Sequence, residues 1–117
     1  MKLFIVDDDA IWTKVLCQSL TNKGLTDIKT FTNGQDCLDH LKDEPTAIFL
    51  DYQMDEEDGL SILKKIKIID ETIRVFFCTS HEDLSVALSA IENGSLDFLL
   101  KTNLNESELD RLLYQIN

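Results

Sequence analysis

The sequence predicts an α/β fold in which a doubly wound, five-stranded parallel sheet lies between two layers of helices. Five short apolar runs of strand length alternate along the chain with five stretches of helical periodicity. No repeat or flexible linker interrupts this alternation, and 117 residues suffice for one compact domain but not for two. Parallel neighbours require crossover helices, and right-handed crossovers cover both faces of the sheet. We therefore expect residues 1–117 to form one three-layer α/β/α domain.

The first unit is a strand followed by a helix. Residues 2–6 form a short apolar run that ends at three aspartates, which is typical of a buried strand. Gly24 stands where a left-handed residue is expected to end the helix. The apolar face of this helix is predicted from residues at helical spacing, which are Ile11, Val15, Leu16 and Leu20.

The same pattern of strand and helix then continues. We expect strands at residues 27–31 and 47–50, the second ending at Asp51, with a helix between them at residues 33–41. A further helix is expected to start at Gly59. The residues expected to form the apolar faces of these two helices are Cys37, Leu38, Leu41, Ile62, Leu63 and Ile66.

The last third of the chain completes the alternation. Strands are expected at residues 73–78 and 96–100. Asn105 with Glu108 three residues later resembles a capping box, and this pair predicts the start of the fifth helix. The apolar positions of the fourth and fifth helices are Leu84, Ala87, Leu88, Ile91, Leu109, Leu112, Leu113 and Ile116.

The charge of the chain argues against several classes of function. With 22 acidic and 11 basic residues the net charge is -11, which repels nucleic-acid backbones and anionic lipid surfaces. No apolar run approaches the ~20 residues of a membrane span, and no signal-peptide pattern precedes the first strand. We therefore expect a cytoplasmic protein that binds neither nucleic acid nor membrane directly.

Polar residues follow the strands at the points where the strands end. Asp7, Asp8 and Asp9 follow the first strand, and Asp51 ends the third. In open α/β sheets the functional crevice lies beyond the carboxyl ends of the strands, so these carboxylates should share one edge. The fourth and fifth strands add Thr79, Ser80, Lys101 and Thr102 to that edge.

The carboxylate cluster predicts a bound cation. Two carboxylates ~4 Å apart repel by roughly 4 kcal/mol at an effective dielectric of 20. Asp7, Asp8 and Asp51 therefore need a cation, a proton or solvent between them. All-oxygen ligation favours Mg²⁺, with Mn²⁺ or Ca²⁺ as alternatives, over Zn²⁺. The alternative is that the aspartates cap helices or lie in solvated loops, which we expect of Asp9.

The other polar residues of this edge add different chemistry. We expect the Lys101 ammonium to pair with the carboxylates at rest and with a phosphoryl oxygen after reaction, although a lysine after a strand can also be a solvated surface residue. For Thr79 we favour a hydrogen bond to an anion, and we assign the capping of the next helix to Ser80.

Four segments at these strand ends resemble the receiver domain of bacterial two-component response regulators, and the resemblance spans the whole chain. It implies a flavodoxin-like strand order of 2-1-3-4-5 and a chemotaxis-regulator-like signalling domain that is not an enzyme. The segments are Ile5-Val6-Asp7-Asp8-Asp9, Phe49-Leu50-Asp51-Tyr52-Gln53-Met54 with Asp58-Gly59, Cys78-Thr79-Ser80, and Phe98-Leu99-Leu100-Lys101.

The resemblance implies roles for the acidic residues. Asp51 is the phosphoacceptor of a phosphorelay, and it receives its phosphoryl group from a histidine kinase, a histidine phosphotransfer protein or a small phosphodonor. Asp7 and Asp8 hold Mg²⁺ together with Asp51 and the backbone carbonyl of Gln53. Transfer depends on positioning and charge neutralisation, and water later hydrolyses the acyl phosphate.

The resemblance also implies a conformational switch. Lys101 and Thr79 complete the catalytic set, and after phosphorylation Thr79 moves toward the phosphoryl group while Phe98 turns inward. The surface of the fourth helix, fifth strand and fifth helix then changes for a downstream effector. In the family this surface also forms homodimers. Positions that modulate dephosphorylation are Gln53, Ser80 and His81.

Two features depart from the family pattern. Thr102 stands where family members usually have a proline, often after a cis peptide bond. Because a non-proline cis bond costs ~3 kcal/mol, we expect a trans peptide between Lys101 and Thr102, or a strained cis one. The loop residues 55–58 are all acidic and lack the usual proline, so this edge is unusually acidic.

Three other functions share parts of the pattern. A phosphatase of the haloacid dehalogenase type normally needs an acid two residues after its nucleophile, where this chain has Gln53. A flavodoxin-type flavin carrier binds phosphate in a loop that the three aspartates of residues 7–9 would make repulsive. The main alternative is a receiver-like interaction module that is not phosphorylated, because Thr102 and the acidic loop could impair the site.

Overall fold

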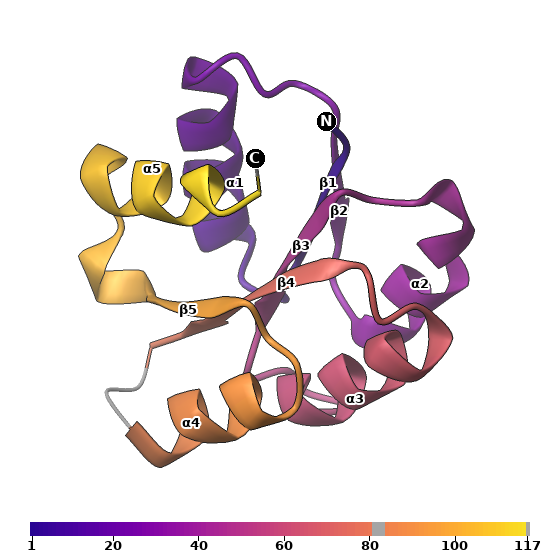
Figure 1. The fold of residues 1–117 in the computed structure, drawn as a ribbon. Helices are drawn as coiled ribbons and strands as arrows, with labels where there is room; N and C mark the ends of the chain where they lie inside the picture. Colours follow the sequence, from indigo (N-terminus) through magenta and orange to yellow (C-terminus); the bar gives the residue numbers. More distant parts are fainter. Residues whose placement is uncertain (81–83, 117) are drawn as a thin grey trace.

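The computed structural model describes residues 1–80 and 84–116, and in them five parallel strands alternate with five α-helices (Figure 1). The strand order is β2-β1-β3-β4-β5, which confirms the predicted fold class and order. The strands are β1 (Leu3–Val6), β2 (Ile28–Phe31), β3 (Ala47–Asp51), β4 (Arg74–Thr79) and β5 (Asp97–Leu100). The helices are α1 (Ala10–Asn22), α2 (Gly34–Asp39), α3 (Gly59–Ile69), α4 (Leu84–Glu92) and α5 (Glu106–Tyr114).

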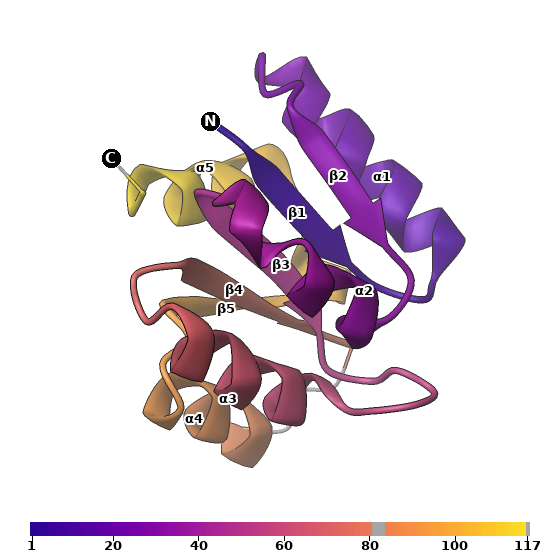
Figure 2. The same cartoon turned by 90° about the vertical axis from the view of Figure 1, so that its right-hand side faces the viewer.

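Helices cover both faces of the sheet. α1 and α5 lie on one face, and α2, α3 and α4 lie on the other, as two perpendicular views show (Figure 1 and Figure 2). Each face has its own core cluster, with Leu16 and Leu112 on the α1 and α5 side and Ile62 and Ile66 on the opposite side. Among the described helices, none combines the length and the apolar character that a membrane crossing requires.

The central strands are buried on both faces, which explains their continuous apolar sequences. In β1, Leu3 and Ile5 contribute to the core under α1 and α5, whereas Phe4 and Val6 contribute to the core under α2, α3 and α4. The register pairs Val6 with Leu50 at the ends of β1 and β3. The residues that follow these strands therefore start from the same edge of the sheet.

The buried face of α1 differs from the predicted one. Leu16 and Leu20 are buried as expected, but Ile11 is 77% exposed and Val15 is 47% exposed, whereas Trp12 is buried. The predicted inward positions of Ile11 and Val15 are therefore wrong. Both possible stripes contain Leu16 and Leu20, and burying the larger apolar area of the Trp12 ring favours the observed rotation.

α4 presents small side chains to the core. Ala87 and Ala90 are buried, whereas Leu88 and Ile91 are 53% and 42% exposed. Leu88 and Ile91, two of the apolar positions of this helix in the sequence, thus lie largely outside the core. Ala90 belongs to the core cluster under α2, α3 and α4, so this helix packs against the sheet through small side chains.

Side-chain caps determine where several helices begin. Asp9 accepts hydrogen bonds from two backbone N–H groups of the first turn of α1, at 3.0 and 3.1 Å, which confirms its predicted capping role. Asn105 caps α5 by accepting a hydrogen bond from the N–H of Glu108 at 2.8 Å. The Glu108 carboxylate pairs with Arg111 instead. Of the two hydrogen bonds of the predicted capping box, the described residues thus show the one that Asn105 accepts.

The ends of three elements refine the sequence-based boundaries. α2 is shorter than predicted, and a 3₁₀ turn at Leu41–Asp43 follows it. Gly24 has a φ of 85°, which confirms the left-handed residue predicted after α1. Lys101 begins a second 3₁₀ turn, Lys101–Asn103. The peptide bond between Lys101 and Thr102 is trans as predicted, because the described residues contain no cis peptide.

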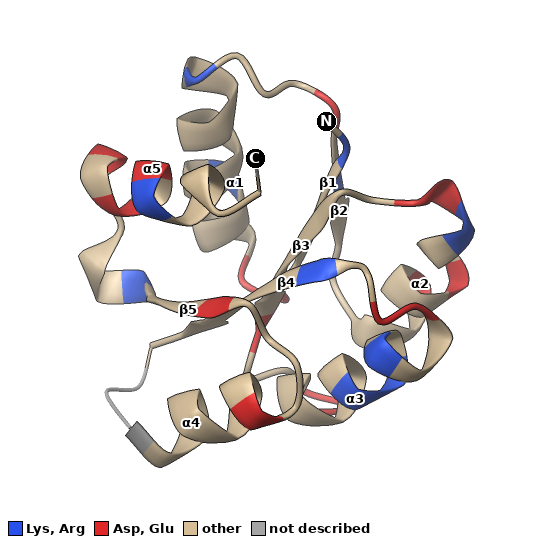
Figure 3. Cartoon of the chain, viewed as in Figure 1, with Lys and Arg blue, Asp and Glu red and all other residues tan. Residues whose placement is uncertain are grey.

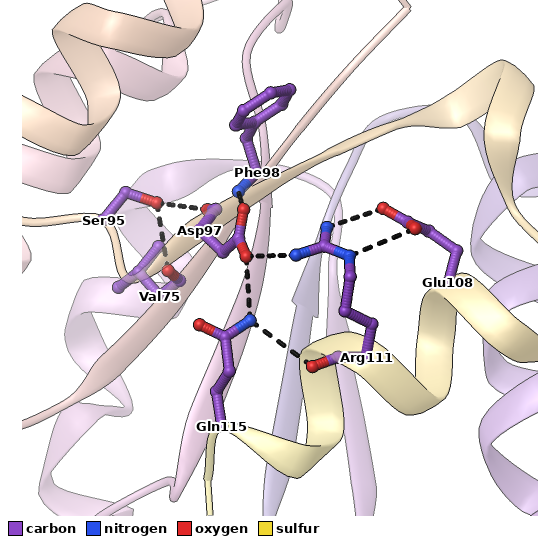
Figure 4. Close-up of polar contacts among 7 residues, drawn as sticks. All are labelled: Val75, Ser95, Asp97, Phe98, Glu108, Arg111 and Gln115. Carbon is purple, nitrogen blue, oxygen red and sulfur yellow. Dashed lines mark hydrogen bonds and ion pairs between the residues drawn. The ribbon is translucent and has the colours of Figure 1, made fainter.

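A polar network ties β5 to α5 (Figure 4). The Asp97 carboxylate accepts hydrogen bonds from the N–H of Phe98 at 2.7 Å, from Arg111 at 2.5 Å and from Gln115 at 2.8 Å. The Ser95 hydroxyl lies 2.6 Å from the carbonyl oxygen of Asp97 and 3.0 Å from a carbonyl oxygen of β4. The start of β5 is therefore attached to both β4 and α5.

Candidate functional site

The candidate site lies at the edge of the sheet where β1 and β3 end, and acidic segments follow both strands there (Figure 3). Carboxylate oxygens of Asp7, Asp8 and Asp51 lie within 4.8 Å of one another. Asp7 and Asp51 are buried, at 2% and 4% exposed, whereas Asp8 is exposed. The structure thus brings together the three carboxylates that the strand ends predicted.

Lys101 reaches this cluster from the end of β5. Its Nζ lies 2.6 Å from Asp7 Oδ2 and 3.2 Å from Asp51 Oδ1. Asp7 Oδ1 accepts a hydrogen bond from the N–H of Asp9 at 2.9 Å. Asp7 Oδ2 is buried, and the Lys101 ammonium is its charged partner.

Burial and like charge alter the acidity of these groups. Burial, with a further contribution from the charge of Asp7, raises the pKa of Asp51 to about 7. Burial also raises the pKa of Asp7, although Lys101 opposes this effect. For Lys101, burial lowers the pKa, but the two carboxylates outweigh burial and raise it. The cluster is therefore stabilised by added positive charge.

The donor set fits a hard divalent cation. It consists of carboxylate oxygens, and Mg²⁺ is usually bound by one or two carboxylates together with waters and phosphate oxygens. Asp7, Asp8 and Asp51 each bring one carboxylate oxygen within 4.8 Å of the others, so one cation would contact all three residues. At the exposed side, Asp8 Oδ2 accepts a hydrogen bond from the N–H of Asp55 at 3.3 Å. Asp8 and Gln53 both line an adjoining hollow of about 490 Å³.

The remaining predicted residues differ in how deeply they are buried. Thr79 ends β4, is 1% exposed, and pairs in register with Leu100, the neighbour of Lys101. Phe98 is half-buried against the core on the α3 and α4 side. Ser80 is exposed. His81 lies outside the described residues, and so do residues 82 and 83, so the capping of the next helix by Ser80 stays a prediction.

Two residues contribute to the site in ways that the sequence did not predict. The Trp12 ring lies under Lys101, with 5.2 Å between Nζ and the ring centre. At Gly59, a Cβ atom would lie 2.1 Å from the backbone carbonyl oxygen of Asp51. Asp58-Gly59 was noted as part of a motif, but the close approach of backbones at Gly59 depends on the tertiary structure.

Comparisons with known proteins match this chain to one domain family. The sequence model of the response regulator receiver domain matches residues 3–114. Chemotaxis protein CheY of Bacillus subtilis strain 168 is 31% identical over 117 residues, which cover 99% of this chain and 94% of the relative. The DNA-binding transcriptional regulator NtrC of Klebsiella pneumoniae is 39% identical over 99 residues, which cover 84% of this chain and 21% of the regulator. This chain thus spans about a fifth of the length of that relative.

Solved structures share the same fold. A chain in the crystal structure of the CheX-CheY-BeF3-Mg+2 complex from Borrelia burgdorferi has a TM-score of 0.91 and 23% identity, covering 99% of this chain and 88% of that chain. A putative response regulator from Chloroflexus aurantiacus J-10-fl has a TM-score of 0.89 and 25% identity, covering 98% of this chain and 95% of that one.

Proposed function

The chain belongs to the response regulator receiver domain family of two-component systems, and from this premise we propose that Asp51 accepts a phosphoryl group in a phosphorelay. The observation that carries the proposal is the position of Asp51. It ends β3, is buried, and lies 3.2 Å from the Lys101 ammonium with Asp7 and Asp8 beside it. In this proposal residues 1–117 act as one receiver domain.

The proposed transfer is an in-line displacement at phosphorus. A carboxylate oxygen of Asp51 forms a bond to phosphorus while the bond from phosphorus to the imidazole nitrogen of a phosphohistidine breaks, and the electron pair leaves with the imidazole. In the later hydrolysis, water attacks phosphorus and the bond to Asp51 breaks. Inorganic phosphate is released, and the Asp51 carboxylate is regenerated.

The residues around Asp51 have distinct tasks in this reaction. Asp7, Asp8, Asp51 and the backbone carbonyl of Gln53 would hold Mg²⁺, or Mn²⁺ in its place. When bound, the metal neutralises charge on the transferring phosphoryl group. Lys101 provides a second, permanent positive charge beside the acceptor oxygen.

The switch and the partners follow from the same proposal. The phosphoryl donor would be a histidine kinase or a histidine phosphotransfer protein. After transfer, the Thr79 hydroxyl would donate a hydrogen bond to a phosphoryl oxygen and Phe98 would turn inward, which changes the surface of α4, β5 and α5. That surface would then bind a downstream protein effector or a second copy of the chain.

Incubation with acetyl phosphate and Mg²⁺, followed by intact mass measurement, tests the proposed acceptor. We expect an adduct of ~80 Da on the wild-type chain, no adduct on Asp51→Asn, and no adduct when a chelator replaces Mg²⁺. Asp9→Asn is the matched control, because Asp9 is an exposed capping residue of the same acidic segment, and this variant should be labelled like wild type.

Two results would contradict the proposal. An adduct that persists in Asp51→Asn would place the acceptor elsewhere. Failure to label the wild-type chain, with acetyl phosphate and also with a phosphorylated cognate kinase, would favour the interaction module that is not phosphorylated.

A further inference from the structure

Trp12 contacts the site from α1, although the proposed reaction assigns it no task. It lies in the first turn of the helix and its ring is buried. The Lys101 ammonium lies 5.2 Å from the centre of that ring. We propose that Trp12 is a positioning residue, whose ring holds the Lys101 ammonium at the carboxylate cluster. The proposal rests on the role of Lys101 in the phosphoryl transfer proposed above.

The ammonium of Lys101 has partners of two kinds. It lies 2.6 Å from Asp7 Oδ2 and 3.2 Å from Asp51 Oδ1, and it also lies over the Trp12 ring. The face of an indole ring carries negative charge density and attracts a cation. Trp12 is 9% exposed and the Lys101 side chain is 14% exposed, so solvent weakens this attraction little.

The ring becomes the decisive partner when the carboxylates bind a metal. A cation held by Asp7, Asp8 and Asp51 would compete with Lys101 for two carboxylates that the ammonium contacts in the structure. The cation would also repel the ammonium. An aromatic face attracts an ammonium but offers a hard cation no oxygen ligand. Trp12 is thus the partner that keeps Lys101 at the site while the carboxylates are engaged.

Lys101 and Trp12 belong to elements of different kinds. Lys101 begins a short 3₁₀ turn directly after β5, and Thr102 next to it is exposed. A lysine has a flexible four-carbon stem, so its ammonium needs fixed partners. Trp12 belongs to a capped helix and packs in the core cluster with Leu16 and Leu99. The rigid ring therefore orients the flexible lysine.

Two substitutions of Trp12 distinguish the effect of an aromatic ring face on Lys101 from the effect of apolar volume. Trp12→Phe keeps an aromatic face, whereas Trp12→Leu keeps apolar bulk without one. With acetyl phosphate and saturating Mg²⁺, we expect Asp51 to be labelled about threefold to tenfold more slowly in Trp12→Leu. Trp12→Phe should recover most of the rate. Leu20→Ala, two turns further along α1 in the same core cluster, loses packing without touching Lys101 and should be labelled at the wild-type rate.

The contact itself can be measured on the unmodified wild-type chain. Nuclear magnetic resonance should detect Overhauser effects between the Lys101 ε-methylene protons and the indole ring. The ring current should also shift those protons upfield, both in metal-free protein and after addition of Mg²⁺ alone. Trp12→Phe should retain an upfield shift, and Trp12→Leu should lose it.

Each outcome decides for or against the positioning role. Absence of the Overhauser effects in wild type, loss of the contact on addition of Mg²⁺, equal slowing by Leu20→Ala, or a Trp12→Phe variant as slow as Trp12→Leu would overturn it. A wild-type chain that takes up no phosphate would contradict the proposed function instead. In that case the resonance measurement would still establish whether Trp12 holds Lys101.

Discussion

Asp51 is a buried carboxylate beside two others, and its protonation depends on that setting. Its pKa is raised to about 7 by burial first and by the Asp7 charge second. The folded protein therefore binds this proton more tightly than the unfolded chain, in which an aspartate has a pKa of about 4. Without metal, Asp51 lowers the stability of the fold as pH rises from about 4 to about 7.

Replacing Asp51 with asparagine should remove this loss of stability. We expect Asp51→Asn to be more stable than wild type by on the order of 1–2 kcal/mol at pH 8 in the presence of a chelator, and by little near pH 4. Urea unfolding at the two pH values measures the difference. Asp9→Asn, a substitution of an exposed residue, should show no gain in unfolding free energy that increases with pH. Equal stability of wild type and Asp51→Asn at pH 8 would contradict the raised pKa.

Gly59 allows α3 to start against the backbone of Asp51. Because a Cβ atom would lie 2.1 Å from the Asp51 carbonyl oxygen and 2.9 Å from Tyr52 Cα, no side-chain movement can relieve the clash. We expect Gly59→Ala to cost about 1–3 kcal/mol of unfolding free energy and to slow the labelling of Asp51, since the start of α3 must shift. Chemical denaturation and the acetyl phosphate assay measure the two effects.

Gly24→Ala is the matched control for Gly59→Ala. Gly24 has a φ of 85° and nothing within 4 Å of its Cβ position, so an alanine there meets backbone strain far from the site. Gly24→Ala should cost roughly 1 kcal/mol and leave labelling unchanged. If both variants slowed labelling equally, the effect of Gly59→Ala would come from lost stability and not from the position of Asp51.

The proximity of the charged site residues was predictable because it follows from topology. Once the strands are parallel, residues that follow β1, β3 and β5 start from one edge, so Asp7, Asp51 and Lys101 were expected to meet there. Their chemical roles stay predictions. The contribution of Trp12 was not predictable, because the rotation of α1 depends on packing against elements distant in sequence. The contribution of Gly59 was not predictable either, because the approach of α3 to β3 depends on the path of the loop between them.

At the scale of elements, the Asp97 network connects the strand that carries Phe98 to the last helix. Burial alone would raise the pKa of Asp97, but hydrogen bonds from Gln115, Arg111 and the N–H of Phe98 outweigh burial, so the pKa is lowered. A lowered pKa means that the ionised carboxylate stabilises the fold above the ordinary aspartate pKa, and that this contribution is lost as pH falls through the folded value.

Asp97→Asn tests this connection between β5 and α5. We expect the variant to lose roughly 1 kcal/mol of unfolding free energy at pH 7, and the difference from wild type to shrink as pH falls toward about 3. Denaturant unfolding across this range measures it. Asp110→Asn is the matched control, because Asp110 pairs with Lys23 at the surface with 67% of its side chain exposed, and such pairs contribute little. A loss for Asp97→Asn that does not change with pH would contradict the ion-pair interpretation.

The order of helices and strands was predictable from periodicity, but helix rotation was less so. α5 has one clear apolar stripe, and Leu109 and Leu112 are buried as expected. α1 and α4 carry apolar residues on more than one face, so spacing could not choose between Ile11 and Trp12 or exclude Leu88 from the core. In α1 the large Trp12 ring is buried and in α4 the small alanines are, so packing against the sheet and not spacing decides which residues are buried.

At the scale of the whole molecule, the net charge of -11 favours any bound cation. We expect MgCl₂ to raise the melting temperature more than NaCl of equal ionic strength, because binding at the carboxylate cluster adds to general screening. Differential scanning calorimetry measures both salts. Asp8→Asn should lose the extra effect of Mg²⁺ and keep the effect of NaCl, whereas Asp9→Asn should keep both. Equal shifts for the two salts in wild type would contradict specific binding.

The contact between Trp12 and Lys101 also gives the protein an intrinsic optical probe. The chain contains one tryptophan, so its indole fluorescence comes from a ring 5.2 Å from the Lys101 ammonium. A nearby charge shifts the emission of an indole ring, so a cation bound at the neighbouring carboxylates, or a phosphoryl group that draws on Lys101, should change the intensity or wavelength of that emission. Metal binding and phosphorylation could then be followed in real time on the unlabelled protein.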